Sequence, residues 1–127
     1  MSNKLYRIDW DKYLSPLREN KSSRDYDGIG PDKRNPFESD LGRVVFCPAI
    51  RRMHDKTQVV PLTSGDCVLT RLTHSIIVMN IAESLCLNYC RDNDFKELYG
   101  DKWFDYYTSI YAIVRAASLV HDIGNTP

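Results

Sequence analysis

The sequence predicts an all-α protein. In two long segments, residues 68–94 and 103–124, apolar side chains recur every three or four positions, which is the spacing of one helix face. No alternation of apolar and polar residues extends beyond a few positions, so no strand is predicted. The chain has 127 residues, of which 43% are hydrophobic and 27% are charged, and we therefore expect one globular unit at most.

The sequence pattern predicts that residues 1–38 form two segments outside the main helical domain. Residues 1–18 place Trp10 and Tyr13 at helical spacing, and we expect a short arm or helix that docks on the rest. Residues 19–38 are dense in charge, Gly and Pro, which predicts a long polar loop with poor order. The helical domain is then expected to occupy residues 39–127.

Two short helices are predicted at the start of this domain. Ser39 or Asp40 is expected to cap the first helix, because short polar side chains accept hydrogen bonds from the first helical N–H groups. Pro48 interrupts the pattern, and a second helix follows it. Ile50 and Met53 are expected to face the core.

The segment 68–94 predicts the strongest helix. Its expected buried face is a set of apolar side chains three or four residues apart: Val78, Ile81, Ala82, Leu85 and Tyr89. His74 lies four residues before this set and is expected to share its face.

The segment 103–124 predicts the second long helix. Its expected inward face is formed by Ile110, Val114, Ala117 and His121. Gly124 is expected to end the helix in the left-handed conformation, and Pro127 prevents its continuation.

Charge and hydropathy exclude several classes of partner. The 17 Lys and Arg residues balance the 17 Asp and Glu residues, so the net charge gives no indication of nucleic-acid binding. No apolar run approaches the roughly 20 residues of a membrane span, and the charged N-terminus is unlike a signal peptide. We therefore predict a cytoplasmic protein without a membrane segment.

No two of the four cysteines form a CxxC pair, the spacing that is typical of metal and redox sites. We therefore expect the cysteines to be small buried side chains. Cys86 and Cys90 stand four residues apart, a spacing that can also hold a metal on a helix. We favour the structural interpretation for both.

His74, His121 and Asp122 are the residues whose types suggest metal binding. Imidazole nitrogens and a carboxylate oxygen from two helices can converge on one divalent ion. The alternative is that both histidines are hydrogen-bonded core residues and Asp122 is a solvated charge. An acid at a helix C-terminus opposes the helix dipole at a cost of roughly 0.3–1 kcal/mol, which weakly favours the metal interpretation.

Arg71 and Gln58 are candidate substrate-binding residues near the predicted metal ligands. Arg71 lies three residues before His74, where its guanidinium would reach a phosphate bound beside the metal. Exposure to solvent is equally compatible with the spacing. Gln58 has a donor and an acceptor for a sugar or base, although a loop amide is often only solvated. For Arg51 and Arg52, a solvated helix face is favoured over phosphate contact.

Three motifs together resemble one enzyme family. "FESDLGRVVFCPAIRRMHDKTQVVPL", "TRLTHS" and "HDIGN" occur in this order and at separations similar to those of the deoxyguanosine triphosphate triphosphohydrolases (dGTPases) of the HD-domain superfamily. The resemblance covers roughly residues 37–127. It implies the N-terminal, incomplete part of an HD-domain helical bundle.

The resemblance also implies a reaction and a set of site residues. The family hydrolyses a deoxynucleoside triphosphate, here dGTP in the first place, to the deoxynucleoside and inorganic triphosphate. A divalent ion such as Mg²⁺ or Mn²⁺ would be bound by His74, His121 and Asp122. Arg71 would contact the triphosphate, Gln58 would lie against the deoxyribose, and Asn125 would also bind substrate. The resemblance further implies a homo-oligomer.

The chain departs from the family after "HDIGN". The family usually continues as Pro-Pro-Phe-Gly-His, whereas Thr126 and Pro127 follow here. The resemblance places the catalytic histidine and a fourth metal ligand beyond residue 127, so we expect the chain alone to bind metal weakly and to be inactive. We also expect both long helices to be partly uncovered, which favours association.

Two other functions stay open. One is an HD phosphohydrolase that acts on another nucleotide, which Gln58 before the "RLTH" motif disfavours. The other is a non-catalytic helical module that oligomerises with or regulates a full-length enzyme.

Overall fold

The computed structural model describes residues 7–15, 34–58 and 69–124. Every regular element in these ranges is helical, apart from one isolated antiparallel bridge between Thr57 and Thr70, and the all-α prediction is confirmed. The elements are α1 (Trp10–Tyr13), α2 (Pro36–Val45), α3 (Pro48–Arg52), the 3₁₀ turn η2 (Met53–Asp55), α4 (Arg71–Arg91), α5 (Asn93–Tyr99), the 3₁₀ turn η3 (Gly100–Lys102) and α6 (Trp103–Val120).

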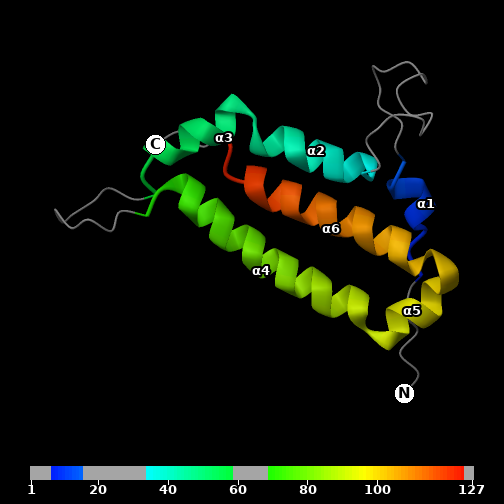
Figure 1. Ribbon diagram of the computed structural model, residues 1–127. Helices are drawn as coiled ribbons and strands as arrows, with labels where there is room; N and C mark the ends of the chain where they lie inside the picture. The colour runs from blue at the N-terminus through cyan, green and yellow to red at the C-terminus, as the bar shows by residue number, and fades with distance from the viewer. Residues whose placement is uncertain (1–6, 16–33, 59–68, 125–127) are drawn as a thin grey trace, which may run out of the picture.

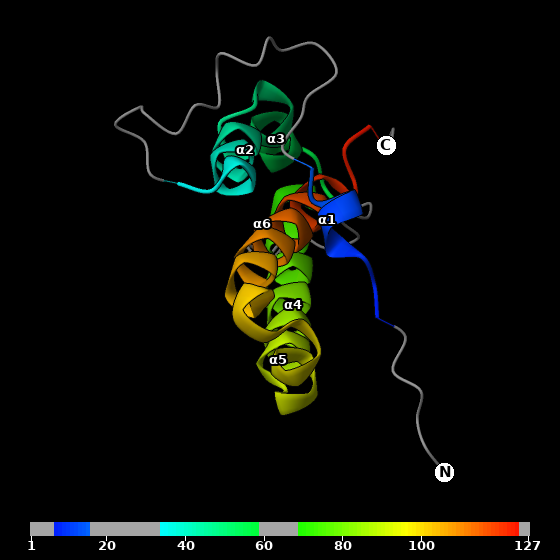
Figure 2. The same cartoon turned by 90° about the vertical axis from the view of Figure 1, so that its right-hand side faces the viewer.

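Helix α6 is the centre of the arrangement. It lies between α2 and α4, and α1 and α5 gather at one end while α3 lies at the other (Figure 1). In the view turned by 90°, α2 and α3 lie on one side of α6, and α4 and α5 lie on the other (Figure 2). The last turn of α6 therefore meets the first turn of α4 at the α3 end of the molecule.

Helix α2 begins earlier than the sequence predicted. Asn35, not Ser39 or Asp40, is the N-cap: its side chain accepts from the Phe37 N–H at 2.9 Å, and the Glu38 side chain accepts from the Asn35 N–H at 3.1 Å. This reciprocal pair forms a capping box, and Pro36 occupies the first helical position, where its missing N–H has no cost. Residues 34–38 therefore do not continue the predicted polar loop.

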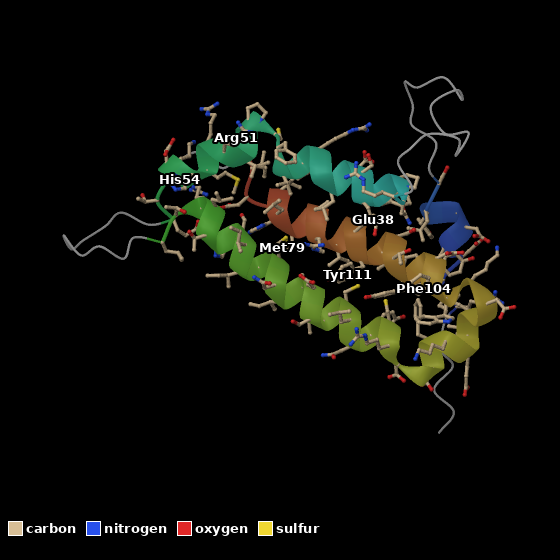
Figure 3. The ribbon with its side chains drawn as sticks, in the orientation of Figure 1. Glu38, Arg51, His54, Met79, Phe104 and Tyr111 are labelled. Atoms are coloured by element: carbon tan, nitrogen blue, oxygen red, sulfur yellow. The ribbon has the colours of Figure 1, made fainter. Side chains whose placement is uncertain are left out.

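The buried face of α4 differs from the predicted one. Ser75, Cys86 and Cys90 are buried, whereas Ile81, Leu85 and Tyr89 are 57%, 65% and 54% exposed. The small side chains allow α4 to approach α6 closely, and the larger apolar side chains lie on the opposite face. Met79 and Tyr111 point into the space between these helices, and Tyr111 donates a hydrogen bond to Glu83 of α4 (Figure 3).

The inward face of α6 was predicted only in part. Ile110 and Val114 pack against the buried cluster of Cys86, Cys90, Phe95 and Tyr99 as expected. Ala117 and His121 are exposed, while Ala112 and Leu119 are buried instead. The buried positions shift because α6 contacts α2 as well as α4, so its core-facing surface is wider than one stripe.

A second cluster closes the other end of the molecule. Ile50, Met53 and Leu119 are each 4% exposed and pack together, which confirms the predicted inward role of Ile50 and Met53. The break at Pro48 between α2 and α3 is also confirmed. Gly124 has a φ of 91°, the left-handed conformation that was predicted for the end of the α6 region.

The N-terminal arm docks on α5 and α6, as predicted. Ile8 exchanges two hydrogen bonds of 3.2 Å with the Tyr99 hydroxyl, which accepts from its N–H and donates to its C=O. Asp11 accepts from Lys102 at 2.9 Å and from the Tyr106 hydroxyl at 2.8 Å. These two donors lower the pKa of the Asp11 carboxyl, so the contact is strongest when Asp11 is charged.

Cys86 and Cys90 behave as structural residues. Their sulfurs are 4.0 Å apart, and both thiols are buried. Burial raises the pKa of Cys90 to about 12 and also raises that of Cys86, so both thiols stay protonated near neutral pH. Metal binding by this pair is disfavoured, since a metal needs the thiolate. No helix within the described parts of the chain is long and apolar enough to cross a membrane.

Candidate metal and phosphate site

A short backbone ladder brings Gln58 to the start of α4. The Gln58 N–H donates to the Leu69 C=O at 2.9 Å, and the Arg71 N–H donates to the Lys56 C=O at 2.8 Å. These two bonds flank the bridge between Thr57 and Thr70. Two predicted substrate-binding residues, Gln58 and Arg71, are thus held close together, each directly after one residue of the bridge.

The N-cap of α4 fixes where the site residues leave the helix. Thr70 has an extended backbone, and its hydroxyl oxygen accepts from the Thr73 N–H at 3.2 Å. This cap satisfies one of the donors that the first helical turn leaves unpaired. Arg71 is therefore the first helical residue, and His74 lies one turn later on an overlapping face.

Arg71 and Asp122 form a buried ion pair between α4 and the turn after α6. The Arg71 Nη1 donates to the Asp122 Oδ2 at 2.9 Å, and the two side chains are only 12% and 8% exposed. A carboxylate at this depth needs a charged partner, because an isolated buried charge costs several kcal/mol. Arg71 supplies that partner.

The structure brings His74 and His121 together. Their ring centroids are 5.4 Å apart, with an angle of 55° between the ring planes. His74 is half-buried, whereas His121 is exposed, so the prediction that His121 continues a buried stripe is wrong. The reason is that α6 ends at Val120. His121 is the residue after the helix and lies next to the first turns of α4.

A backbone hydrogen bond sets the tautomer of the His121 ring, that is, which ring nitrogen carries the hydrogen. Its Nδ1 lies 2.7 Å from the Ser118 C=O, which can only accept, so Nδ1 carries the proton. In the neutral ring the lone pair is then on Nε2. Metal-binding histidines commonly donate their second N–H to a carbonyl in this way, and the bond orients Nε2 for a ligand.

A cavity of about 240 Å³ opens beside the ion pair. Its polar lining comes from four charged side chains, and its remaining walls are small or apolar; the lining residues are Ala49, Arg52, Met53, Lys56, Arg71, Asp122, Ile123 and Gly124. From the sequence, Arg52 was expected on a solvated face, and Lys56 was expected to face away from the core without a binding role. The sequence signal that could have indicated a basic site is the concentration of positive charge at Arg51, Arg52 and Lys56. Lys56 is also the residue whose C=O accepts from the Arg71 N–H.

The Gln58 side chain also has an unusual environment. Its Oε1 is buried and has no hydrogen-bond partner in the described part of the chain. A buried amide oxygen without a partner is costly, and such groups are often explained by a ligand or water. Asn125, the third predicted substrate-binding residue, lies outside the described residues.

Curated relatives resemble nearly the whole chain. A deoxyguanosinetriphosphate triphosphohydrolase-like protein of Listeria innocua is 39% identical over 124 residues, which are 94% of this chain and 26% of the relative. A deoxyguanosinetriphosphate triphosphohydrolase of Salmonella typhimurium is 44% identical over 95 residues, 72% of this chain and 18% of the relative. This chain belongs to the dGTPase family.

The chain spans about a quarter of the length of the dGTPase relatives that it matches. A third relative, a deoxyguanosinetriphosphate triphosphohydrolase-like protein of Pseudomonas aeruginosa, is 37% identical over 120 residues and shows the same proportion, 94% of this chain and 26% of the relative. No protein-family model matches the chain, and no solved structure matches it significantly.

His74, His121 and Asp122 fit, in type, the divalent ion that the resemblance implies, and the two histidines are already close. The adjacent imidazoles and the set tautomer of His121 suit a metal. Asp122 is paired with Arg71, and no group of three His, Cys, Asp or Glu side chains in the described ranges is arranged to hold an ion. A complete set would require the Asp122 carboxylate to turn towards the two rings.

Proposed function

We propose that this chain supplies part of the active site of a metal-dependent enzyme that hydrolyses a deoxynucleoside triphosphate, with dGTP as the first candidate, to the deoxynucleoside and inorganic triphosphate. The observation that carries the proposal is the meeting of His74 and His121, with ring centroids 5.4 Å apart, beside the Arg71–Asp122 pair. These two contacts each join the first turn of α4 to the end of α6. Membership of the dGTPase family supports this reaction class.

Each residue has a role that matches its environment. His74, His121 and Asp122 would hold the divalent ion, which would polarise a phosphoryl oxygen and activate water. Arg71 would neutralise negative charge on the triphosphate, and its bond to Asp122 orients the guanidinium beside the cavity. The buried Gln58 Oε1 would accept a hydrogen bond from a deoxyribose hydroxyl.

Metal binding is the first test of the proposal. We expect the chain to bind Mn²⁺ in a calorimetric titration and His74→Ala to weaken that binding by at least about tenfold, since removing one of three ligands costs more than 1.4 kcal/mol. His54→Ala is the matched control. His54 is exposed, forms a bond to Asp55 at 3.2 Å, and contributes nothing to the proposed ligand set. Equal Mn²⁺ affinity in all three proteins would contradict the proposal.

Activity is the second test. In a polypeptide that continues past Pro127 along the family's sequence, we expect triphosphate release from dGTP to require Mn²⁺ and to be lost in His74→Ala but retained in His54→Ala. Unchanged release in His74→Ala would exclude the proposed metal site.

A second candidate function is a non-catalytic helical module that associates with an enzyme. The exposed apolar face of α4 favours it, because Ile77, Ile81, Leu85 and Tyr89 are 44–65% exposed. In that case the module would bind its partner equally well with and without His74. A pull-down of a full-length dGTPase relative by the wild-type chain and by His74→Ala separates this function from metal binding.

A further inference from the structure

The cavity beside Arg71 is small and strongly basic. Its volume of about 240 Å³ is below the roughly 300–1,000 Å³ of pockets that enclose drug-sized ligands, so it suits only part of a nucleotide. Three cations, Arg52, Lys56 and Arg71, line it together with one carboxylate, Asp122. Since Arg71 and Asp122 pair with each other, the lining keeps a net positive charge from the other two residues.

Arg52 and Lys56 are the cations of this cavity other than Arg71. Among the residues that the structure describes, neither of them forms an ion pair with a carboxylate. Two cations that face one concave space repel each other, and an anion bound between them removes that repulsion. The cavity therefore has the electrostatics of an anion site.

The backbone that carries both cations is fixed. Lys56 is anchored because its C=O accepts from the Arg71 N–H at 2.8 Å, at the first turn of α4. Arg52 ends α3, and its neighbours Ile50 and Met53 are buried in the second cluster. Figure 3 shows Arg51 and His54 of the same segment at this end of the molecule. The backbone positions of Arg52 and Lys56 relative to Arg71 are thus set by the fold.

We propose that Arg52 and Lys56 form a subsite for the terminal phosphates of a polyphosphate chain, in the cavity beside Arg71 whose lining does not include the two histidines. This inference rests on the proposed function, in which Arg71 contacts the triphosphate. Arg52 would bind phosphate oxygens through two parallel N–H groups, and Lys56 would act as a point charge. The subsite would make the site selective for a triphosphate over a monophosphate, because a single phosphate beside the metal does not reach it.

The test uses inorganic triphosphate and inorganic phosphate as probes, titrated calorimetrically into the 127-residue chain without divalent metal. The double variant Arg52→Gln/Lys56→Gln removes both charges of the subsite. The double variant Arg51→Gln/Lys12→Gln is the matched control, because it removes the same total charge from residues that do not line this cavity. All four positions are at least partly exposed, so the folds are expected to persist, which far-ultraviolet circular dichroism checks.

We expect the wild-type chain to bind triphosphate more tightly than phosphate. The subsite variant should lose about 100-fold in triphosphate affinity, about tenfold for each charge-assisted contact, and the control variant less than about threefold. Equal losses in the two variants would show a general charge effect and overturn the proposal. Absence of triphosphate binding, or unchanged binding in the subsite variant, would overturn it as well.

The experiment separates this subsite from the proposed function. The titrations contain no Mn²⁺ and no nucleoside, so they do not depend on His74. Loss of triphosphate binding in the subsite variant, together with unchanged Mn²⁺ binding in His74→Ala, would keep the subsite and reject the metal centre. The opposite pair of results would keep the metal centre and reject the subsite.

Discussion

The Arg71–Asp122 pair is the residue-scale feature on which both the fold and the site depend. It joins the first residue of α4 to the turn after α6 and is buried on both sides. A buried ion pair contributes little net stability when intact, but removing one partner leaves an uncompensated charge. The pair therefore has a structural cost that can be measured separately from substrate binding.

Arg71→Gln tests this pair. We expect it to lower the free energy of unfolding by about 3–5 kcal/mol, because the buried Asp122 carboxylate would lose its ion pair with Arg71. Arg43→Gln breaks the exposed Arg43–Asp40 pair, whose side chains are 56% and 41% exposed, and should cost at most about 1 kcal/mol. Urea denaturation of both variants gives the two values. Similar small losses would mean that Asp122 is solvated in solution.

The Cys90 thiol is expected to make the free energy of unfolding depend on pH in the alkaline range. Folding raises its pKa from 9.0 to about 12, so the folded state holds the proton more tightly than the unfolded chain. This stabilisation is fully present below pH 9.0 and is lost as the pH rises towards about 12. We expect the urea midpoint to fall as the pH rises from 9.0 towards about 12, and to fall less in Cys90→Ala, which has no thiol to ionise. Parallel pH curves for the two proteins would contradict this.

The candidate residues of the site could be selected from the sequence, but the contacts between them could not. His74, His121, Asp122, Arg71 and Gln58 were all selected from residue type and spacing or from the resemblance, and the structure brings the two histidines together and pairs Arg71 with Asp122. That pairing was not predicted, because it depends on how α4 and α6 cross. Lys56 was missed for the same reason: its place in the cavity depends on a backbone ladder between two distant segments.

At the scale of single elements, the sequence predicted the helices but not the face of α4. Apolar residues surround much of this helix, so periodicity alone could not decide which face packs on α6. The deciding factor is side-chain size, since Ser75, Cys86 and Cys90 allow close contact where Ile81 and Leu85 would not. The start of α2 was missed because Asn35 was grouped with the polar residues that precede it.

Asn35 is expected to stabilise α2 in two ways. Its Oδ1 caps the helix, and its Nδ2 donates to the buried Ser109 Oγ of α6 at 2.7 Å. Asn35→Ala should therefore cost at least about 1 kcal/mol, the usual value for a lost N-cap, with a further loss for the unpaired Ser109. Asn80→Ala, at an exposed position within α4, should be neutral or slightly stabilising. Thermal denaturation compares the two variants, and equal effects would exclude a capping role.

At the scale of the whole molecule, the two packed clusters lie at opposite ends of α6. One cluster contains Cys86, Cys90, Phe95 and Tyr99, and the other contains Ile50, Met53 and Leu119. The second cluster supports the start of α4 and the turn after α6, and so positions the candidate site. The outer face of α4 takes part in neither cluster.

That outer face predicts self-association of the chain. Ile77, Ile81, Leu85 and Tyr89 follow one another at four-residue steps and are exposed, so they form an apolar row of the kind that marks an interaction surface. We expect a second copy to cover it, so that Leu85→Glu shifts the sedimentation coefficient towards that of the monomer, because a buried carboxylate would oppose contact. Ala117→Glu adds the same charge at an exposed position of α6 and should leave association unchanged. A wild-type chain that sediments as a monomer at all concentrations would show that this face stays solvated.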